Sequence, residues 1–359
     1  MADSKQAPLD AAAAAKAAFA SVQDKPFPED IFTAPELRWA VIGCGVIANQ
    51  MAQSLALAGR KLAGVANRTL FKAQAFAEQY GIEKVYETVE DLYADPDIDA
   101  VYITTPHNTH ITYLRAALAA GKHVLCEKAI TLNSAELDEA RAIAAEHNVV
   151  LMDATTVLHM PLYQELRRRM DAGDFGRMNL AQLNFGSYKE YGDLTNRFYN
   201  RNLAGGAMLD IGVYALSVMR LFMASQPTEN VSLGNTCETG VDVAGGIVCR
   251  NAEQQLGVVS LTLHSKQPKR SVISFDKCYI EVNEYPRADH ATIVWTADGH
   301  REEVTAGTEA YALCYEMADL EQAVAGDDSK RELLDYASDV MELMTKLRAD
   351  WGVVYPEEE

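Results

Sequence analysis

The chain has 359 residues, with 32 basic and 51 acidic side chains and a formal net charge of −19. This excess of negative charge argues against a nucleic-acid-binding protein, which needs a basic surface, and against docking on an anionic membrane. A hydrophobic share of 48% and a charged share of 23% are those of a soluble globular protein. The six cysteines contain no Cys-x-x-Cys pair, which favours free thiols in the reducing cytoplasm over a zinc site or disulfides.

Residues 1–36 differ from the rest of the chain and are interpreted as an N-terminal arm. An alanine-rich stretch predicts one short helix, which Pro26 and Pro28 would end. The arm lacks the basic start and the long apolar run of a secretory signal. Its apolar side chains predict that it packs on folded protein, either its own nucleotide domain or a neighbouring subunit: Phe19, Val22, Phe27, Ile31 and Phe32. A disordered tail is the alternative.

Residues 37–155 alternate short apolar runs with segments of helical length. The expected strands are 39–42, 62–66, 100–104, 123–126 and 149–152, and the clearest helices are 111–120 and 134–147. Strands that are apolar throughout, alternating with helices, predict a parallel sheet covered on both faces, as in a Rossmann dinucleotide-binding domain. The fold class is therefore α/β.

Residues 156–340 are expected to form a second domain that binds substrate and forms oligomer contacts. Helices are expected over 162–172, 208–223, 309–325 and 330–351, and strands over 178–187, 231–237, 245–249, 257–263, 271–275, 279–282 and 291–295. Short connections between most of these strands predict a large, mainly antiparallel sheet. Residues 341–359 would form the end of the last helix and a tail.

The first strand runs directly into Gly43-Cys44-Gly45-Val46-Ile47-Ala48. In a dinucleotide-binding turn the first glycine allows the tight turn, the second lets the pyrophosphate approach, and the third position is small so that helix and strand pack closely. The helix start at Val46 and Ile47 would then hold the phosphates. The alternative is a glycine turn in an unrelated α/β protein.

The second strand is followed by Asn67, Arg68 and Thr69, where an NAD enzyme usually carries an acidic residue. The guanidinium of Arg68 can bind a 2′-phosphate with two hydrogen bonds, and Thr69 adds a hydroxyl. This pattern favours NADP, with NAD as second choice. In the alternative reading Arg68 stacks on the adenine or faces solvent.

Two further motifs lie at the carboxyl ends of predicted parallel strands, the edge where such sheets bind ligands. One is Thr104-Thr105-Pro106-His107, which we expect beside the nicotinamide; the other is Glu127-Lys128. An isolated lysine at such a place usually reaches solvent, and an isolated histidine usually has a structural role.

In Gly205-Gly206-Ala207-Met208-Leu209-Asp210-Ile211-Gly212-Val213-Tyr214 two glycines lead into a helix. Asp210 and Tyr214 are four residues apart and should share one face, with Asp210 in the first turn. Polar and aromatic residues elsewhere in this domain suit a polyhydroxylated ring and are the remaining substrate-binding candidates: Tyr188, Arg197, Asn202 and His159.

Taken together, these motifs resemble the glucose-fructose oxidoreductase/inositol dehydrogenase/rhizopine-catabolism (Gfo/Idh/MocA) family, and within it the dihydrodiol and xylose dehydrogenase branch. The resemblance covers about residues 37–355, and the ending Trp351-Gly352-Val353-Val354-Tyr355-Pro356 is also similar to that branch. It implies a Rossmann domain followed by a domain with a large open sheet that often forms a dimer interface or a larger assembly.

The resemblance places the family's catalytic lysine on Lys128 and its aspartate on Asp210, and it puts Tyr214 where many members have a histidine. Tyrosine has a reference pKa near 10, and a neighbouring ammonium favours the phenolate. Tyr214 is then the acid/base, assisted by Lys128, and Asp210 orients a substrate hydroxyl or Lys128. The family usually reads Glu-Lys-Pro, whereas Ala129 stands here; the turn is either trans or held cis by its surroundings.

The resulting hypothesis is an NADP-dependent oxidoreductase acting on a sugar, cyclic polyol or dihydrodiol, without a metal and as a homodimer or higher homo-oligomer. A non-catalytic NAD(P)-binding regulator on the same fold is the main alternative. A glycosidase that recycles NAD in place is a third, which the branch likeness does not favour. Neither substrate identity nor reaction direction follows from the sequence.

Overall fold

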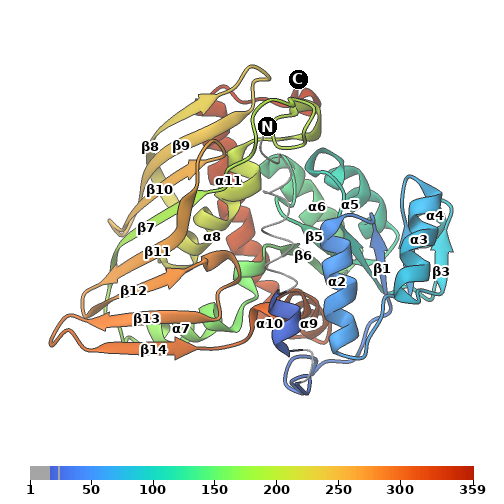
Figure 1. The fold of residues 1–359 in the computed structure, drawn as a ribbon, viewed down its shortest axis with the longest axis horizontal. Helices are drawn as coiled ribbons and strands as arrows, with labels where there is room; N and C mark the ends of the chain where they lie inside the picture. Colours follow the sequence, from blue (N-terminus) through green and yellow to red (C-terminus); the bar gives the residue numbers. More distant parts are fainter. Residues whose placement is uncertain (1–16, 23–24) are drawn as a thin grey trace. The chain divides into compact units, whose positions relative to one another are not determined.

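The computed structural model describes residues 17–22 and 25–359; residues 1–16 and 23–24, which hold most of the helix expected in the arm, lie outside the described residues. Contacts within the chain define two compact units (Figure 1). One unit combines the described residues up to 154 with 310–335 and is called the nucleotide unit here. The other combines 155–309 with 336–359 and is called the sheet unit.

The nucleotide unit contains a six-stranded parallel sheet with the order β3-β2-β1-β4-β5-β6. Its strands are β1 (Trp39–Ile42), β2 (Gly64–Ala66), β3 (Lys84–Tyr86), β4 (Ala100–Ile103), β5 (His123–Glu127) and β6 (Leu151–Ala154). From β1 the chain adds β2 and β3 on one side of the sheet, and it then adds β4, β5 and β6 on the other side of β1. In such sheets the ligand crevice lies where the strand order reverses, which here is between β1 and β4. The predicted Rossmann-type sheet is thereby confirmed.

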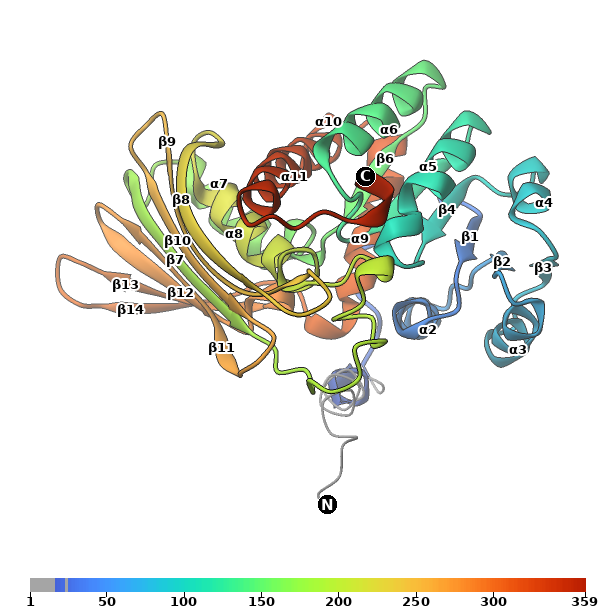
Figure 2. The same ribbon diagram turned by 90° about the horizontal axis from the view of Figure 1, so that it is seen from above.

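Helices cover both faces of this sheet (Figure 2). They are α2 (Val46–Leu57), α3 (Leu70–Tyr80), α4 (Val89–Ala94), η1 (His107–Thr109), α5 (His110–Ala119) and α6 (Ser134–Glu146). The helix predicted over 134–147 begins at residue 134, and Asn133 caps it, because its side chain accepts a hydrogen bond from the Glu136 amide at 3.0 Å. Gly81 ends α3 in the left-handed conformation that favours glycine.

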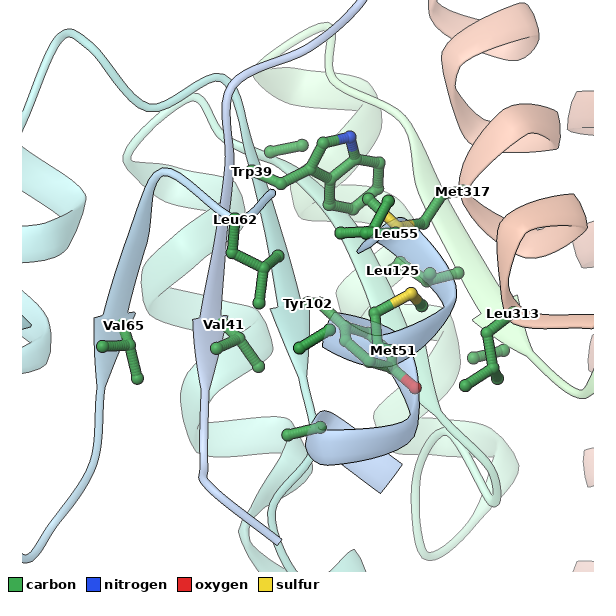
Figure 3. Packing of buried hydrophobic residues seen from close by; sticks show 14 of the residues in the cluster. Trp39, Val41, Met51, Leu55, Leu62, Val65, Tyr102, Leu125, Leu313 and Met317 are labelled. Carbon is green, nitrogen blue, oxygen red and sulfur yellow. The ribbon is translucent and has the colours of Figure 1, made fainter. Parts of the chain in front are cut away.

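A buried apolar cluster joins α2, α3 and the sheet to a helix from much later in the sequence (Figure 3). This helix, α9 (Ala312–Val324), contributes Leu313 and Met317 to the cluster, and both are almost fully buried. The indole of Trp39 donates to Glu321 of the same helix at 3.0 Å. Residues 310–335, which include η6 (Glu309–Tyr311) in part and α10 (Asp328–Arg331), therefore belong to the nucleotide unit, although their sequence position suggests the second domain.

The described part of the arm packs on the nucleotide unit. Residues 17–22 are helical, and Val22 and Ile31 are buried. The ring of Phe27 meets that of Tyr311 edge to face at 5.0 Å, and the Arg60 guanidinium lies 4.0 Å from the centroid of Phe32. Of the two surfaces considered for the arm, the structure shows contacts with the chain's own nucleotide unit.

The sheet unit is built on an eight-stranded mixed sheet with the order β14-β13-β12-β11-β7-β10-β9-β8. Its strands are β7 (Met178–Gly186), β8 (Pro227–Thr236), β9 (Asp242–Asn251), β10 (Leu256–Thr262), β11 (Gln267–Phe275), β12 (Cys278–Asn283), β13 (His290–Trp295) and β14 (Arg301–Thr305). Only the β7–β10 pair is parallel among these described strands. This confirms the expected large, mainly antiparallel sheet.

Helices of the sheet unit lie along one face of this sheet (Figure 2). The long helices on this face are α7 (Pro161–Asp171), α8 (Val213–Phe222) and α11 (Leu333–Asp350). The unit also contains the short segments η2 (Thr156–Leu158), η3 (Arg201–Leu203), η5 (Tyr285–Arg287) and η7 (Pro356–Glu358), and the π-helix η4 (Met208–Gly212). The segment Arg201–Phe222 is apolar and long enough to cross a membrane, but 83% of its most apolar window is buried inside the protein, as in a core helix.

Three local features differ from the sequence-based expectations. Strands β3 and β14 were not expected, since three or five residues with mixed polarity carry little periodic signal. The helix expected over 208–223 begins with a π-turn. Asp210 therefore lies in a turn with the i to i+5 hydrogen-bond spacing of a π-helix, which is wider than an α-helical turn. The six cysteines, by contrast, are free thiols as the sequence predicts, and four of them are buried.

Candidate active site

The glycine turn after β1 leaves space at the start of α2. Gly43 has φ +105°, and a Cβ there would lie 2.6 Å from the Thr104 hydroxyl oxygen, so this position requires glycine. Gly45 is exposed, and an added Cβ would meet no described atom within 4 Å. Ala48 is fully buried between helix and sheet, as the small third position of the motif predicts.

This turn fits a dinucleotide phosphate. Gly45 is the N-cap of α2, and among the described residues no side chain caps that helix. The amides of the first helical turn are therefore left for another acceptor, and the helix dipole favours an anion. The Gly43 amide itself is used, since it donates to the Ala66 carbonyl at 2.9 Å and joins the end of β1 to the end of β2.

The turn after β2 exposes the cation expected beside the ribose. The Asn67 side chain donates to the Thr69 carbonyl at 3.0 Å and orders this turn, and Arg68 is exposed. Sequence reasoning missed a second cation, Lys72, in the first turn of α3. Burial raises the pKa of the Cys44 thiol to about 11, and the charge of Lys72 opposes that rise. Its position four residues after Arg68, close to the end of the predicted strand, was the available signal.

Two histidines connect the loop after β4 to the loop after β5. Nε2 of His107 lies 3.1 Å from the Lys128 carbonyl oxygen. The ring nitrogens of His110 lie 2.8 Å from the Thr105 carbonyl oxygen and 3.0 Å from that of Ala129. Burial lowers the pKa of His110, and the hydrogen bonds to backbone carbonyls oppose this shift. His107, predicted beside the nicotinamide, is thus engaged with the backbone of the lysine loop.

Neighbouring polar groups of this edge are also fixed. The Thr104 hydroxyl donates to the Ile42 carbonyl at 3.0 Å, and the Thr109 hydroxyl donates to that of Thr105 at 2.8 Å. Pro106, between them, is exposed at the start of η1. Hydrogen bonds of this kind hold the end of β4 against the end of β1, where the dinucleotide turn begins.

Lys128 directly follows β5 at the carboxyl edge of the sheet and is half-buried. Its peptide bond with Ala129 is cis, which is one of the two arrangements considered for a chain without the family's proline. The Tyr102 hydroxyl donates to the Glu127 carboxylate, and Ala129 is fully buried. The nucleotide unit therefore presents Lys128 on the same sheet edge as the glycine turn and the 104–107 loop.

In the sheet unit, Asp210 and Tyr214 come from one continuous helical segment. Asp210 lies in the π-turn and is 8% exposed; Tyr214 lies in the first turn of α8 and is half-buried. The ring of Tyr214 packs against Phe185 of β7, with 6.1 Å between ring centroids. A π-turn widens the helix locally and is frequent at functional sites.

The loop between β7 and η3 brings cationic and aromatic groups to Asp210. The guanidinium of Arg197 lies 3.4 Å from Asp210 Oδ1 and 4.3 Å from the centroid of Phe198. Lys189 lies on the same ring at 4.2 Å, and Tyr188 is 45% exposed. Phe198 and Lys189 were not predicted; their closeness to Arg197 in an aromatic-rich loop was the signal.

The other two substrate candidates differ in placement. Asn202 is exposed in η3, and its backbone amide donates to the side-chain oxygen of Asn200 at 2.9 Å. His159, by contrast, is completely buried at the end of η2, and its carbonyl accepts from Gln164. Among these candidates, the structure brings Arg197 together with Asp210.

Family models match both parts of the chain. The model described as an oxidoreductase family with an NAD-binding Rossmann fold matches residues 37–155, and the Gfo/Idh/MocA C-terminal domain matches residues 163–281. The mouse trans-1,2-dihydrobenzene-1,2-diol dehydrogenase is 32% identical over 254 residues, covering 69% of this chain and 75% of the relative. The pig enzyme of that name is 28% identical over 341 residues, covering 90% and 99%.

Solved structures share the fold. A point mutant of KijD10, a 3-ketoreductase from Actinomadura kijaniata, in a complex with TDP-benzene and NADP, has a TM-score of 0.75 at 25% identity, covering 88% of this chain and 98% of that one. Levoglucosan dehydrogenase, with NADH and levoglucosan, has a TM-score of 0.76 at 19% identity, covering 87% and 97%. The matched relatives are named as dehydrogenases and reductases, and this chain is likewise an enzyme. The chain belongs to the Gfo/Idh/MocA family of NAD(P)-binding oxidoreductases.

Proposed function

We propose that this enzyme transfers a hydride between NADP and a carbon that bears a hydroxyl or keto group in a sugar, cyclic polyol or dihydrodiol. Two placements support the proposal. The open dinucleotide turn and Lys128 lie on the same edge of the parallel sheet, and Asp210 and Tyr214 lie on the same helical segment. The test of the proposal is a panel of aldoses, ketoses, inositols and dihydrodiols, with nicotinamide absorbance followed for both cofactors. A panel without turnover would contradict it.

The chain's own residues divide the work as follows. Tyr214 takes the hydroxyl proton in oxidation and returns it in reduction, and the Lys128 ammonium favours the phenolate and bonds the reacting oxygen. Asp210 orients a substrate hydroxyl, with Arg197 beside it. When bound, the nicotinamide supplies or accepts the hydride. Thr104, Thr105 and Pro106 line the position of the nicotinamide ring. Tyr188 has an exposed ring that can stack on an apolar face of a sugar.

A non-catalytic regulator on the same fold is the second candidate, but no observation favours it, because Lys128, Asp210 and Tyr214 are all present. It predicts tight NADPH binding with no turnover on any member of the panel. The free thiols of the chain agree with a reducing compartment, and we place the enzyme in the cytoplasm.

NADP is the proposed cofactor because two cations follow β2. Arg68 is exposed after the strand end, and Lys72 lies in the first turn of α3, where its charge opposes the rise in the pKa of Cys44. A 2′-phosphate bonded by a guanidinium gains charge-assisted hydrogen bonds that a ribose hydroxyl cannot make. The KijD10 complex with NADP supports this choice.

Arg68→Ala should therefore weaken NADP binding about tenfold to a hundredfold while changing the Kd of NAD by less than about threefold. Only NADP carries the phosphate, so the ratio of the two Kd values, from nicotinamide fluorescence titrations, is the measurement. Arg177→Ala, at an exposed arginine of the sheet unit, is the control. Equal losses for NADP and NAD would contradict the role given to Arg68.

We also propose that the chain forms a homodimer or higher homo-oligomer through the eight-stranded sheet. Val231 and Leu233 of β8 are 77% and 83% exposed, and Val248, Leu256 and Tyr279 add exposed apolar surface on β9, β10 and β12. Large apolar side chains gathered on one sheet usually mark a contact surface.

Leu233→Glu should therefore lower the mass in solution toward that of one chain, because a buried unpaired carboxylate opposes association. Light scattering gives the mass, and thermal unfolding checks that the variant stays folded. Phe71→Glu, at an exposed phenylalanine of the nucleotide unit, is the matched control. An unchanged mass for Leu233→Glu would contradict this use of the sheet.

A further inference from the structure

The helical segment with Asp210 and Tyr214 begins on a buried carboxylate from another strand. Asp242, at the start of β9, is completely buried, and its Oδ2 accepts a hydrogen bond from the Met208 amide at 2.6 Å. Met208 is the first residue of the π-turn, so Asp242 takes the place of a helix cap that the local sequence does not supply. Asp242 thus fixes the point from which Asp210 and Tyr214 extend.

The Gly205–Gly206 turn is shaped to allow this approach. Gly206 has φ +128°, and a Cβ there would collide with Oδ1 of Asp242. A Cβ on Gly205 would lie 2.6 Å from the carbonyl oxygen of Arg197. The two glycines therefore let the turn sit between the carboxylate on one side and the Arg197 loop on the other.

A second group reaches the same turn from the end of the chain. The Tyr355 hydroxyl donates to the Gly205 carbonyl at 2.7 Å, and Tyr355 is completely buried. The guanidinium of Arg348 lies 4.6 Å from the ring centroid of Tyr355 and bonds Glu358 at 2.7 Å and 2.9 Å. The C-terminal segment is thereby held against the start of the helix.

Asp242 is an unusual choice for packing alone. Burial raises its pKa to about 6, opposed by the Met208 amide and by the charge of Arg348. Since the folded pKa lies above the unfolded value, ionising Asp242 lowers stability as the pH rises from about 4 to about 6. Its Oδ1 has no hydrogen-bond partner among the described residues. At neutral pH the buried Asp242 side chain is therefore a carboxylate, although burial disfavours its charge. The carboxylate faces the start of a helix, where the helix dipole favours negative charge.

We propose that Asp242 and Tyr355 are positioning residues for Asp210 and Tyr214, acting through the Gly205–Gly206 turn and the Met208 amide. This inference rests on the proposed function, because it assumes that Asp210 and Tyr214 carry the reaction. It adds two groups from β9 and from the C-terminal segment, neither of which belongs to a motif of the site.

The test compares three variants at pH 8, where Asp242 is ionised, with the substrate on which the panel shows turnover. Tyr355→Phe removes one hydroxyl and should lower kcat about threefold to tenfold. Asp242→Ala should lower kcat about tenfold to a hundredfold, and Asp242→Asn should restore most of it, because an amide oxygen can still accept from Met208. KM and the Kd of NADPH should change by less than about twofold in all three.

Tyr163→Phe is the matched control. Tyr163 is also buried in the sheet unit, and its hydroxyl donates to the Tyr285 carbonyl at 2.7 Å, the same kind of bond at the same length. Its removal should leave kcat within about twofold. If Tyr355→Phe behaves like this control, or if kcat falls only together with the folded fraction or with a matching rise in KM, the inference is overturned.

Amide hydrogen exchange supplies a measurement independent of activity. Peptides that cover residues 205–214 should exchange faster in Tyr355→Phe and Asp242→Ala than in Tyr163→Phe. If Asp242→Ala folds poorly, the exchange rates of Tyr355→Phe alone test the inference. Exchange in Tyr355→Phe equal to that in Tyr163→Phe overturns it. Tyr214→Phe in the same assay separates the two proposals. Normal turnover of Tyr214→Phe contradicts the proposed function, whereas loss there with normal kcat in Tyr355→Phe and Asp242→Ala contradicts only the positioning role.

Discussion

Replacing Tyr214 by phenylalanine should lower kcat by about 10²- to 10⁴-fold, the range contributed by a positioned proton-transfer group. The ring would still pack against Phe185, so only the hydroxyl is removed. NADPH binding should survive, because the dinucleotide turn belongs to the nucleotide unit and Tyr214 to the sheet unit. Single-turnover kinetics and a fluorescence titration of NADPH measure the two effects separately.

The same experiment needs a tyrosine whose hydroxyl has no chemical role. Tyr163→Phe serves, since it removes one hydroxyl from the same unit and should keep turnover within about twofold. Near-normal turnover of Tyr214→Phe would mean that another group moves the proton. A fall in kcat with an equal loss of NADPH affinity would instead point to a damaged fold.

The parts of the fold that carry a periodic signal were predictable from the sequence. Strand β1 has the expected bounds, Trp39–Ile42, because four consecutive apolar residues precede a glycine turn. The start of α6 at Ser134 also agrees with the predicted helix over 134–147, since a side-chain cap acts within three residues of the helix start. The carboxyl ends of β1, β2, β4 and β5 are where the predicted cofactor residues lie, because a parallel sheet aligns those ends.

Contacts between distant segments could not be predicted in the same way. Helix α9 packs on the nucleotide unit because Leu313 and Met317 contact the buried cluster that includes Trp39. The sequence shows that a helix has an apolar face, but it does not show which surface that face contacts. Asp242 and Tyr355 reach Gly205–Gly206 from distant parts of the chain, so the sequence did not predict these two contacts. The backbone contact of His107 likewise arises only when the loops after β4 and β5 are side by side.

The catalytic and cofactor residues were a different kind of prediction. Their types and spacing favoured nicotinamide chemistry, but a lone Lys128 or Tyr214 has an equally good structural reading. Resemblance to the family separated the two readings, and the match to both family models supports it. The roles of Lys128, Asp210 and Tyr214 stay predictions that turnover measurements decide.

The two glycines of the dinucleotide turn should respond differently to the addition of one methyl group. Gly45 has φ −78° and ψ −171°, which alanine adopts freely, and an added Cβ meets no described atom within 4 Å. Gly45→Ala should therefore keep its unfolding free energy within about 0.5 kcal/mol. The methyl would instead occupy the space through which the pyrophosphate approaches, and the Kd of NADPH should rise at least about tenfold.

Gly43→Ala, by contrast, should destabilise the protein itself. Its φ of +105° is strained for alanine, and the new Cβ would lie 2.6 Å from the Thr104 hydroxyl oxygen. We expect a loss of about 1–3 kcal/mol in unfolding free energy together with weaker NADPH binding. Thermal unfolding without cofactor and fluorescence titration with NADPH separate the two variants. NADPH binding of wild-type strength in Gly45→Ala would show that the phosphates do not approach the backbone at this turn.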